Sequence, residues 1–319
     1  MRKISVLMLF FILISASINL FACSDIESNA FPDNGKINIM SSLFPQYDFA
    51  KHIAGDKANV ALLLPPATES HMFDLRPADM LNIYNADLFL YTGDYMEPWA
   101  GEIVKSIPAD NKLVVVDCSS GVEFIEDDHE HDHENEAEHI HEDHALDPHI
   151  WLNPVFAMMM VDNILDALCE IDAENADYYI QNADDYKNLL KKLDADIFAA
   201  IEASQRDVLV FGGRFAYIYF LTHFDLEYVT VYDSCSTNAE PSVKAVTDVT
   251  DFIIKNKIPC IYHEEFVQPA VAKAIAKQTN ITYELFSTAH NVTKADFDSG
   301  VTFIDIMYRN LESIKKGLN

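Results

Sequence analysis

Short β-rich runs alternate with amphipathic stretches along most of this chain, and this alternation is the feature that most constrains its fold. Four strands are expected in the first half, at 37–40, 59–64, 88–91 and 113–116. Four more are expected in the second half, at 208–211, 228–231, 260–262 and 283–286. Because helical patterns separate these runs, the sequence predicts βαβ units, with mostly parallel sheets and helices on both faces.

One long helical stretch divides the two halves, from about Val155 to Ala203. Between Asn182 and Ser204 its apolar residues recur at helical spacing, without proline or glycine. We therefore expect an α/β protein of two lobes, each with a mostly parallel sheet flanked by helices, joined by one long connecting helix. The expected boundaries are 36–178 for the first lobe, 179–205 for the connecting helix and 206–319 for the second lobe, which ends in a helix from about 298 to 316.

Residues 1–22 are expected to be a signal peptide rather than part of the fold. Met1-Arg2-Lys3 is a basic start, and an apolar run follows from Ile4 to Phe21. That run approaches spanning length, so a permanent transmembrane anchor is the alternative. The segment Leu20-Phe21-Ala22-Cys23 resembles the bacterial lipoprotein cleavage box and favours export. We expect Cys23 to be acylated and residues 23–35 to be a polar tether, which places the protein on the extracytoplasmic face of a membrane.

The charge balance excludes one broad class of partner. The chain has 22 Lys+Arg against 51 Asp+Glu, a net charge of −29. Nucleic acids and anionic membrane surfaces both require a basic footprint, so neither is expected as the main partner. A chain this acidic attracts cations instead.

Four cysteines follow Cys23, and their wide spacing does not resemble a small disulfide scaffold. Two disulfides remain open in any of three connectivities, but buried free thiols are the favoured interpretation. These residues are Cys118, Cys169, Cys235 and Cys260.

Half of the histidines lie in one low-complexity segment, 123–147. Six of the twelve histidines of the chain fall there, among twelve Asp and Glu residues. Imidazoles interleaved with carboxylates suit divalent transition metals, so we expect a loop that captures metal weakly at several sites. The alternative is an acidic solvated loop with incidental histidines. The six are His129, His131, His133, His139, His141 and His144.

Four isolated histidines are more informative, because three of them follow predicted strands. His71 comes after the strand at 59–64, His263 after 260–262 and His290 after 283–286, while His149 directly follows the His-rich segment. Ligands of open α/β sheets bind beyond the carboxyl ends of the strands. A shared, closed four-coordinate site there would bind Zn²⁺ without doing chemistry. His52 and His223 lie inside predicted helices and are expected to be structural.

Several motifs between about Lys36 and the C-terminus resemble the metal-specific (cluster A-I) substrate-binding lipoproteins of ABC transporters, which take up zinc or manganese. The motifs are Glu69-Ser70-His71 with Asp74-Leu75-Arg76-Pro77, the His-rich insertion, Asp147-Pro148-His149-Ile150-Trp151-Leu152-Asn153-Pro154, and Gly300-Val301-Thr302-Phe303 with Met307, Asn310 and Leu311. The resemblance implies that His71 and His149 are metal ligands. It also implies two α/β lobes joined by a rigid helix, with the metal between them.

The chain departs from that family at one position. The family places a third histidine a few residues before a Phe-x-Tyr in the second lobe, but the stretch 211–217 has no histidine. The second lobe must then supply its ligand differently. We expect His290 first and His263 second, with Glu265 or Cys235 as further candidates. A site with three histidines would favour zinc over manganese, which prefers oxygen donors.

The resulting hypothesis is a monomeric, extracytoplasmic solute-binding protein. It would capture a divalent metal, zinc with manganese as the alternative, between two lobes and deliver it to the permease of an ABC importer. One alternative is a surface adhesin or scaffold in which the metal is structural. Another is a zinc hydrolase, but no His-Glu-x-x-His helix, nucleophile elbow or phosphate-binding glycine loop is present in the sequence, so no enzymatic activity is expected.

Overall fold

The computed structural model describes residues 30–70, 73–108, 110–125, 146–232, 235 and 241–319. Residues Phe31–Asn319 form one compact unit. Three predicted features lie outside the described residues: the signal peptide with Cys23, the candidate ligand His71, and the six histidines between 129 and 144. Among the helices that the structure describes, none has the length and apolar character needed to cross a membrane.

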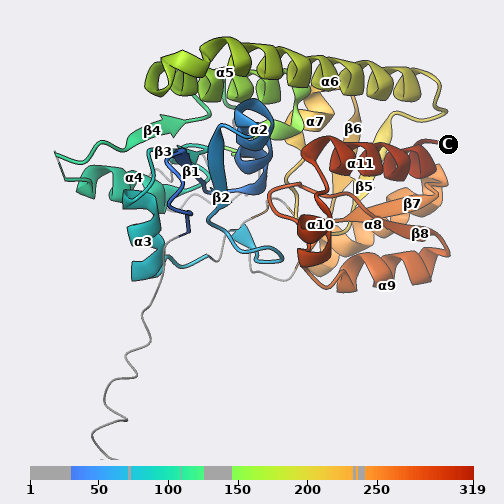
Figure 1. Ribbon diagram of the computed structural model, residues 1–319. Helices are drawn as coiled ribbons and strands as arrows, with labels where there is room; N and C mark the ends of the chain where they lie inside the picture. Colours follow the sequence, from blue (N-terminus) through green and yellow to red (C-terminus); the bar gives the residue numbers. More distant parts are fainter. Residues whose placement is uncertain (1–29, 71–72, 109, 126–145, 233–234, 236–240) are drawn as a thin grey trace, which may run out of the picture. The chain divides into compact units, whose positions relative to one another are not determined.

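The first lobe is built on a four-stranded parallel sheet of order β2-β1-β3-β4 (Figure 1). Its strands are β1 (Ile37–Ser41), β2 (Ala58–Leu62), β3 (Leu88–Tyr91) and β4 (Val114–Asp117). Its helices are α2 (Phe44–Ala54), α3 (Pro77–Tyr84) and α4 (Pro98–Ser106). All four residues of β3 are buried, as expected for a strand whose sheet is covered on both faces.

The second lobe repeats this topology with a parallel sheet of order β6-β5-β7-β8. Its strands are β5 (Val208–Phe211), β6 (Glu227–Thr230), β7 (Cys260–His263) and β8 (Thr282–Leu285). Its helices are α7 (Ile218–His223), α8 (Val243–Asn256), α9 (Ala270–Thr279), α10 (Lys294–Ser299) and α11 (Phe303–Leu318). The predicted α/β fold is confirmed, because all eight expected strands are present and pair in parallel.

The helical stretch between the lobes is not continuous. It begins after η2 (Ile150–Leu152) and consists of α5 (Pro154–Ile171), η3 (Ala173–Asn175) and α6 (Ala176–Glu202). The chain leaves helical geometry at Asp172, where φ is −138° and ψ is 63°. The connecting helix is α6, which packs against α2 of the first lobe and α11 of the second.

The last helix was predicted at 298–316, but its predicted beginning is wrong, because the chain leaves helical geometry at Gly300. Gly300 ends α10 in the left-handed conformation, with φ of 75°. Thr302 then caps α11, because its hydroxyl accepts from the Asp305 amide while the Asp305 carboxylate accepts from the Thr302 amide. Two helices therefore replace one.

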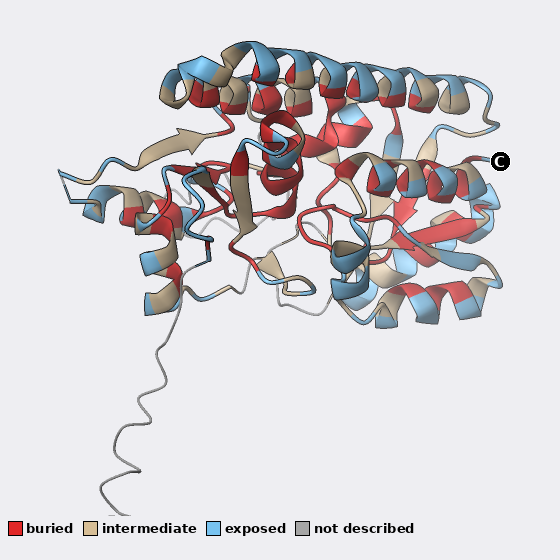
Figure 2. Cartoon of the chain, in the orientation of Figure 1, coloured by how far each residue is buried: buried red, intermediate tan, exposed pale blue. Residues whose placement is uncertain are grey.

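Both lobes contribute to the largest hydrophobic core, which includes Ile39 of β1, Tyr186 of α6 and Tyr262 of β7. Figure 2 shows this buried layer facing inward from α5, α6 and α11. Buried Asp48 of α2 adds a polar link, since its Oδ2 accepts from the Tyr186 hydroxyl at 2.8 Å and from the Phe303 amide at 3.0 Å. A continuous core of this kind resists wide separation of the lobes.

Candidate metal centre

A small pocket of about 20 Å³ contains the predicted ligands His149 and His290. That volume is about the space of one water molecule or ion. Glu69 and His149 come from the first-lobe segments, while the second lobe contributes most of the wall. The lining residues are Glu69, His149, Arg214, Ala216, Cys235, Glu264, Glu265, Val267, Thr288 and His290.

His149 is held in place by Asp147, two residues earlier. The Asp147 carboxylate accepts from the His149 backbone amide at 2.8 Å and from Nδ1 of its ring at 2.9 Å. The imidazole is fully buried. Because Nδ1 faces Asp147, Nε2 is the ring atom that would coordinate a metal.

The Cys235 side chain lies beside the His149 ring and acts on its ionisation. Burial works to lower the pKa of His149, but Cys235 and Asp147 together raise that pKa to about 10. These two neighbours therefore favour the protonated imidazole when no metal is bound. A metal that binds this ring must displace that proton.

His290 is oriented by a similar arrangement in the second lobe. Its Nδ1 contacts the Thr288 hydroxyl, and that hydroxyl donates to Oε1 of Glu265 at 2.8 Å. Oε1 of Glu265 is also 3.6 Å from Nδ1 of His290. Ala289, between the two side chains, is held in the left-handed region with φ of 59°. Here too a carboxylate stands behind Nδ1, and Nε2 is the coordinating atom.

The loop that carries His290 is tied to the first lobe at both of its ends. Trp151 donates from Nε1 to the Thr288 carbonyl at 2.7 Å. Asn291 donates from Nδ2 to the carbonyls of Pro65 and Thr68, each at 2.8 Å. The segment 65–68 leads directly to the Glu69-Ser70-His71 motif. No sequence motif points to Asn291, although it directly follows a predicted ligand.

Local packing leaves no room for a histidine at the Gly212-Gly213 turn that precedes the Phe-x-Tyr of the second lobe. A Cβ on Gly212 would lie 2.9 Å from the Cα of Ala272. A Cβ on Gly213 would lie 1.8 Å from Oε2 of Glu264. Neither position accepts a side chain without movement of the backbone or of Glu264. The first side chain after this turn belongs to Arg214, which lines the pocket instead.

His263 does not line the pocket. Its Nδ1 contacts the Glu264 carbonyl at 2.8 Å, and its ring lies near Tyr283. His52 contacts the Asp48 carbonyl one turn earlier on α2, and His223 of α7 contacts the Asp194 carboxylate of α6.

Of the cysteines outside the pocket, Cys118 and Cys260 are buried free thiols and Cys169 is a half-buried one. Among the described residues, no three His, Cys, Asp or Glu side chains are close enough together to hold a metal ion. His71 is not among those residues.

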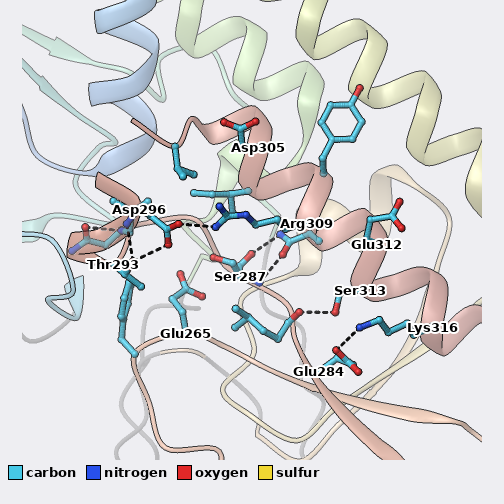
Figure 3. A pocket seen from close by; sticks show the side chains of 18 residues that line it. Glu265, Glu284, Ser287, Thr293, Asp296, Asp305, Arg309, Glu312, Ser313 and Lys316 are labelled. Atoms are coloured by element: carbon cyan, nitrogen blue, oxygen red, sulfur yellow. Dashed lines mark hydrogen bonds and ion pairs between the residues drawn. The ribbon is translucent and has the colours of Figure 1, made fainter. Parts of the chain in front are cut away.

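A larger cavity of about 720 Å³ lies on the other side of Glu265, between the loop after β8 and helices α10 and α11 (Figure 3). Its charged groups are largely paired across the opening. Arg309 donates to Asp296 at 2.9 Å and Lys316 to Glu284 at 2.9 Å. Because it contains no histidine or cysteine, it does not resemble a zinc site.

The chain has two parallel-sheet lobes, a shared core and an interlobe pocket lined by histidines. Together these features are typical of two-lobed metal-binding proteins. The sequence profile described as "ZnuA: Zinc-uptake complex component A periplasmic" matches residues 39–317. The chain belongs to this family, whose members are metal-binding components of ABC uptake systems and not enzymes. The family assignment discards the zinc-hydrolase alternative.

Individual relatives agree with the family. The chain is 31% identical over 311 residues to the high-affinity zinc uptake system protein ZnuA of Bacillus subtilis, covering 97% of this chain and 96% of that protein. It is 30% identical to the zinc-binding lipoprotein AdcA of Streptococcus pneumoniae, of which it spans 61%.

Solved structures share the fold. The metal-dependent lipoprotein YcdH of Bacillus subtilis superposes with a TM-score of 0.75 at 29% identity, covering 89% of this chain and 99% of that one. The Zn(II)-bound ZnuA-like domain of Streptococcus pneumoniae AdcA gives a TM-score of 0.74 at 27% identity, with the same coverage.

Proposed function

We propose that this chain captures zinc between its two lobes and delivers it to the membrane permease of an ABC importer. The observation that carries the proposal is the common pocket of His149 and His290. Each ring has its Nδ1 engaged, by Asp147 in one case and by the Thr288–Glu265 pair in the other. Metal-binding histidines are usually oriented in this way, which fixes Nε2 on the metal.

The ligand set we propose is His71, His149, Cys235 and His290. Cys235 is included because it lines the same pocket and acts on the ionisation of His149. Glu265 is a positioning residue in this proposal, since both of its oxygens accept hydrogen bonds from Thr288. Imidazole and thiolate donors favour zinc, whereas manganese prefers oxygen.

Delivery would require only a small movement. Since the lobes share one hydrophobic core and α6 packs on both, the metal-bound form would differ from the metal-free form by a limited closure of the pocket. Closure would bring the ligands of the two lobes together with His71 around the ion. Docking on the permease and separation of the ligands would then release it.

We propose two accessory roles for segments outside the described residues. The six histidines between 129 and 144 would concentrate cations near the pocket, because the segment is acidic and the chain carries a net charge of −29. Acylation of Cys23 would hold the protein, as a monomer, on the extracytoplasmic face of the membrane. The B. subtilis and S. pneumoniae relatives named above as lipoproteins support this placement.

The test is the zinc affinity of three single variants, measured by competition with a chelator. We expect His149→Ala and His290→Ala each to weaken zinc binding by about a hundredfold or more, since even loss of an outer-shell partner costs about 10–100-fold. His263→Ala is the matched control, because it removes a half-buried second-lobe imidazole that does not line the pocket, and it should leave the affinity unchanged. Unchanged affinity in His149→Ala would refute the site.

A further inference from the structure

Arg214 brings a positive charge into a pocket that would bind a cation. It follows the Gly212-Gly213 turn after β5, and its side chain is 18% exposed. Nη1 donates to the Cys235 carbonyl at 3.4 Å, and the backbone amide donates to Oε2 of Glu264 at 3.0 Å. A guanidinium stays charged at every physiological pH, so this charge is permanent.

The guanidinium lies between carboxylates from the two lobes. Nη1 is 3.9 Å from Oε1 of Glu69, which belongs to the first lobe. Nε is 4.0 Å from Oε1 of Glu264, which belongs to the second. Both carboxylates are largely shielded from water, with side-chain exposures of 18% and 9%. Charges in such surroundings require compensation, and Arg214 supplies it to both.

These two carboxylates are also potential metal ligands. Carboxylate oxygens are the donors that Mn²⁺, Mg²⁺ and Ca²⁺ prefer, whereas imidazole and thiolate suit zinc. A pocket lined by three glutamates would offer a hard cation several oxygens. With Arg214 beside Glu69 and Glu264, Oε1 of each of these two carboxylates lies within 4.0 Å of the guanidinium.

We propose that Arg214 sets the metal preference of the pocket by engaging Glu69 and Glu264 and so withholding their oxygens from the metal. This inference rests on the proposed zinc site. The nitrogen and sulfur donors then remain as the ligand set, and hard cations are disfavoured. Arg214 thus acts as a specificity-determining residue, through the two carboxylates, rather than as a ligand.

The experiment compares the affinities of the full chain for Zn²⁺ and Mn²⁺, each added alone, by chelator competition, with Mn²⁺ electron paramagnetic resonance as a second readout. We expect Arg214→Gln to raise the affinity for Mn²⁺ about tenfold, equivalent to 1.4 kcal/mol, and to change that for Zn²⁺ much less. Arg214→Lys should give an intermediate ratio, since a point charge does not span two carboxylates. Arg309→Gln, which removes an arginine paired with Asp296 outside the pocket, is the matched control.

A triple variant separates the proposed cause from a general charge effect. Adding Glu69→Gln and Glu264→Gln to Arg214→Gln should return the Mn²⁺ affinity to the original value, because the released oxygens are removed again. An unchanged ratio of Mn²⁺ to Zn²⁺ affinity in folded Arg214→Gln would overturn the inference. If that variant does not fold, an unchanged ratio in Arg214→Lys overturns it equally. If His149→Ala leaves the zinc affinity unchanged, the proposed zinc site itself fails, whatever the result for Arg214.

Discussion

Glu97, at the start of α4, is a buried carboxyl group that should make the fold less stable as pH rises from 4.5 to about 8. It occupies the space beyond the carboxyl ends of β1 and β3, where its Oε1 accepts from the Ser42 hydroxyl and its Oε2 from the Thr92 amide at 2.9 Å. Burial raises its pKa from 4.5 to about 8, against the opposing effect of these hydrogen bonds. Between pH 4.5 and about 8, Glu97 is therefore protonated in the folded chain and ionised in the unfolded chain.

The magnitude follows from the two pKa values. A group whose pKa is higher in the folded state contributes stability below its unfolded value and loses it as pH rises through the folded value. Each pH unit between 4.5 and about 8 should then cost the folded state about 1.4 kcal/mol from Glu97 alone. At pH 7 the loss is about 3 kcal/mol relative to pH 4.5.

The perturbation is Glu97→Gln, which keeps the shape of the acid without its charge. Its amide oxygen can accept from the Thr92 amide while its NH2 group donates to the Ser42 hydroxyl oxygen. The assay is urea unfolding of the metal-free protein at several pH values between 5 and 8. We expect the variant to be more stable than the original chain by about 3 kcal/mol at pH 7 and by less than about 1 kcal/mol at pH 5. Glu102→Gln on the same helix is the control, because Glu102 is exposed and pairs only with Lys105. A difference between Glu97→Gln and the original chain that does not grow with pH would refute the reasoning.

Three further predictions concern the loops and the anchor. Asn291→Ala should lower the free energy of unfolding by about 1–2 kcal/mol and weaken zinc binding, because it removes the part-buried hydrogen bonds from its side chain to the carbonyls of Pro65 and Thr68. Urea unfolding and chelator competition would show no change in either quantity if this link between the lobes is unimportant. Cys235→Ser should abolish the sulfur-to-metal charge-transfer band of the Co²⁺-substituted protein, and persistence of that band would exclude Cys235 as a ligand. Cys23→Ser should move the protein from the membrane fraction to the soluble fraction, and continued membrane association would point to an uncleaved apolar anchor.

The fold was largely predictable because the strands are short, buried and flanked by turns. Runs such as Leu88 to Tyr91 and Val208 to Phe211 have no competing helical periodicity, so their positions were clear. Helix ends were harder to place. The break at Asp172 has neither proline nor glycine, and Gly300, which ends α10, falls inside the single helix predicted from about 298 to 316.

Two candidate ligands carry different sequence signals: His149 stands in the Asp147-Pro148-His149 motif after the His-rich segment, and His290 follows a strand. His149 and His290 were expected and line the pocket, whereas His263, also at a strand end, does not. Side chains alternate along an extended chain, so a shift of one residue decides whether His263 or Glu264 faces the cleft. Arg214 carried no recognisable signal beyond the absence of an expected histidine. Its contacts depend on the Glu264 carboxylate and on a residue of the other lobe, which sequence spacing does not reveal.

The central claim is that a single zinc ion binds between the lobes, independently of the His-rich segment. The most direct measurement is the zinc content and affinity of the chain lacking residues 127–145, which keeps Asp147 against the His149 ring. It is made with and without the double substitution of His149 and His290 by alanine. The account predicts one tightly bound zinc after the deletion, lost in the double variant. If tight binding disappears with the deletion alone, zinc binds in the His-rich segment and the interlobe site is wrong.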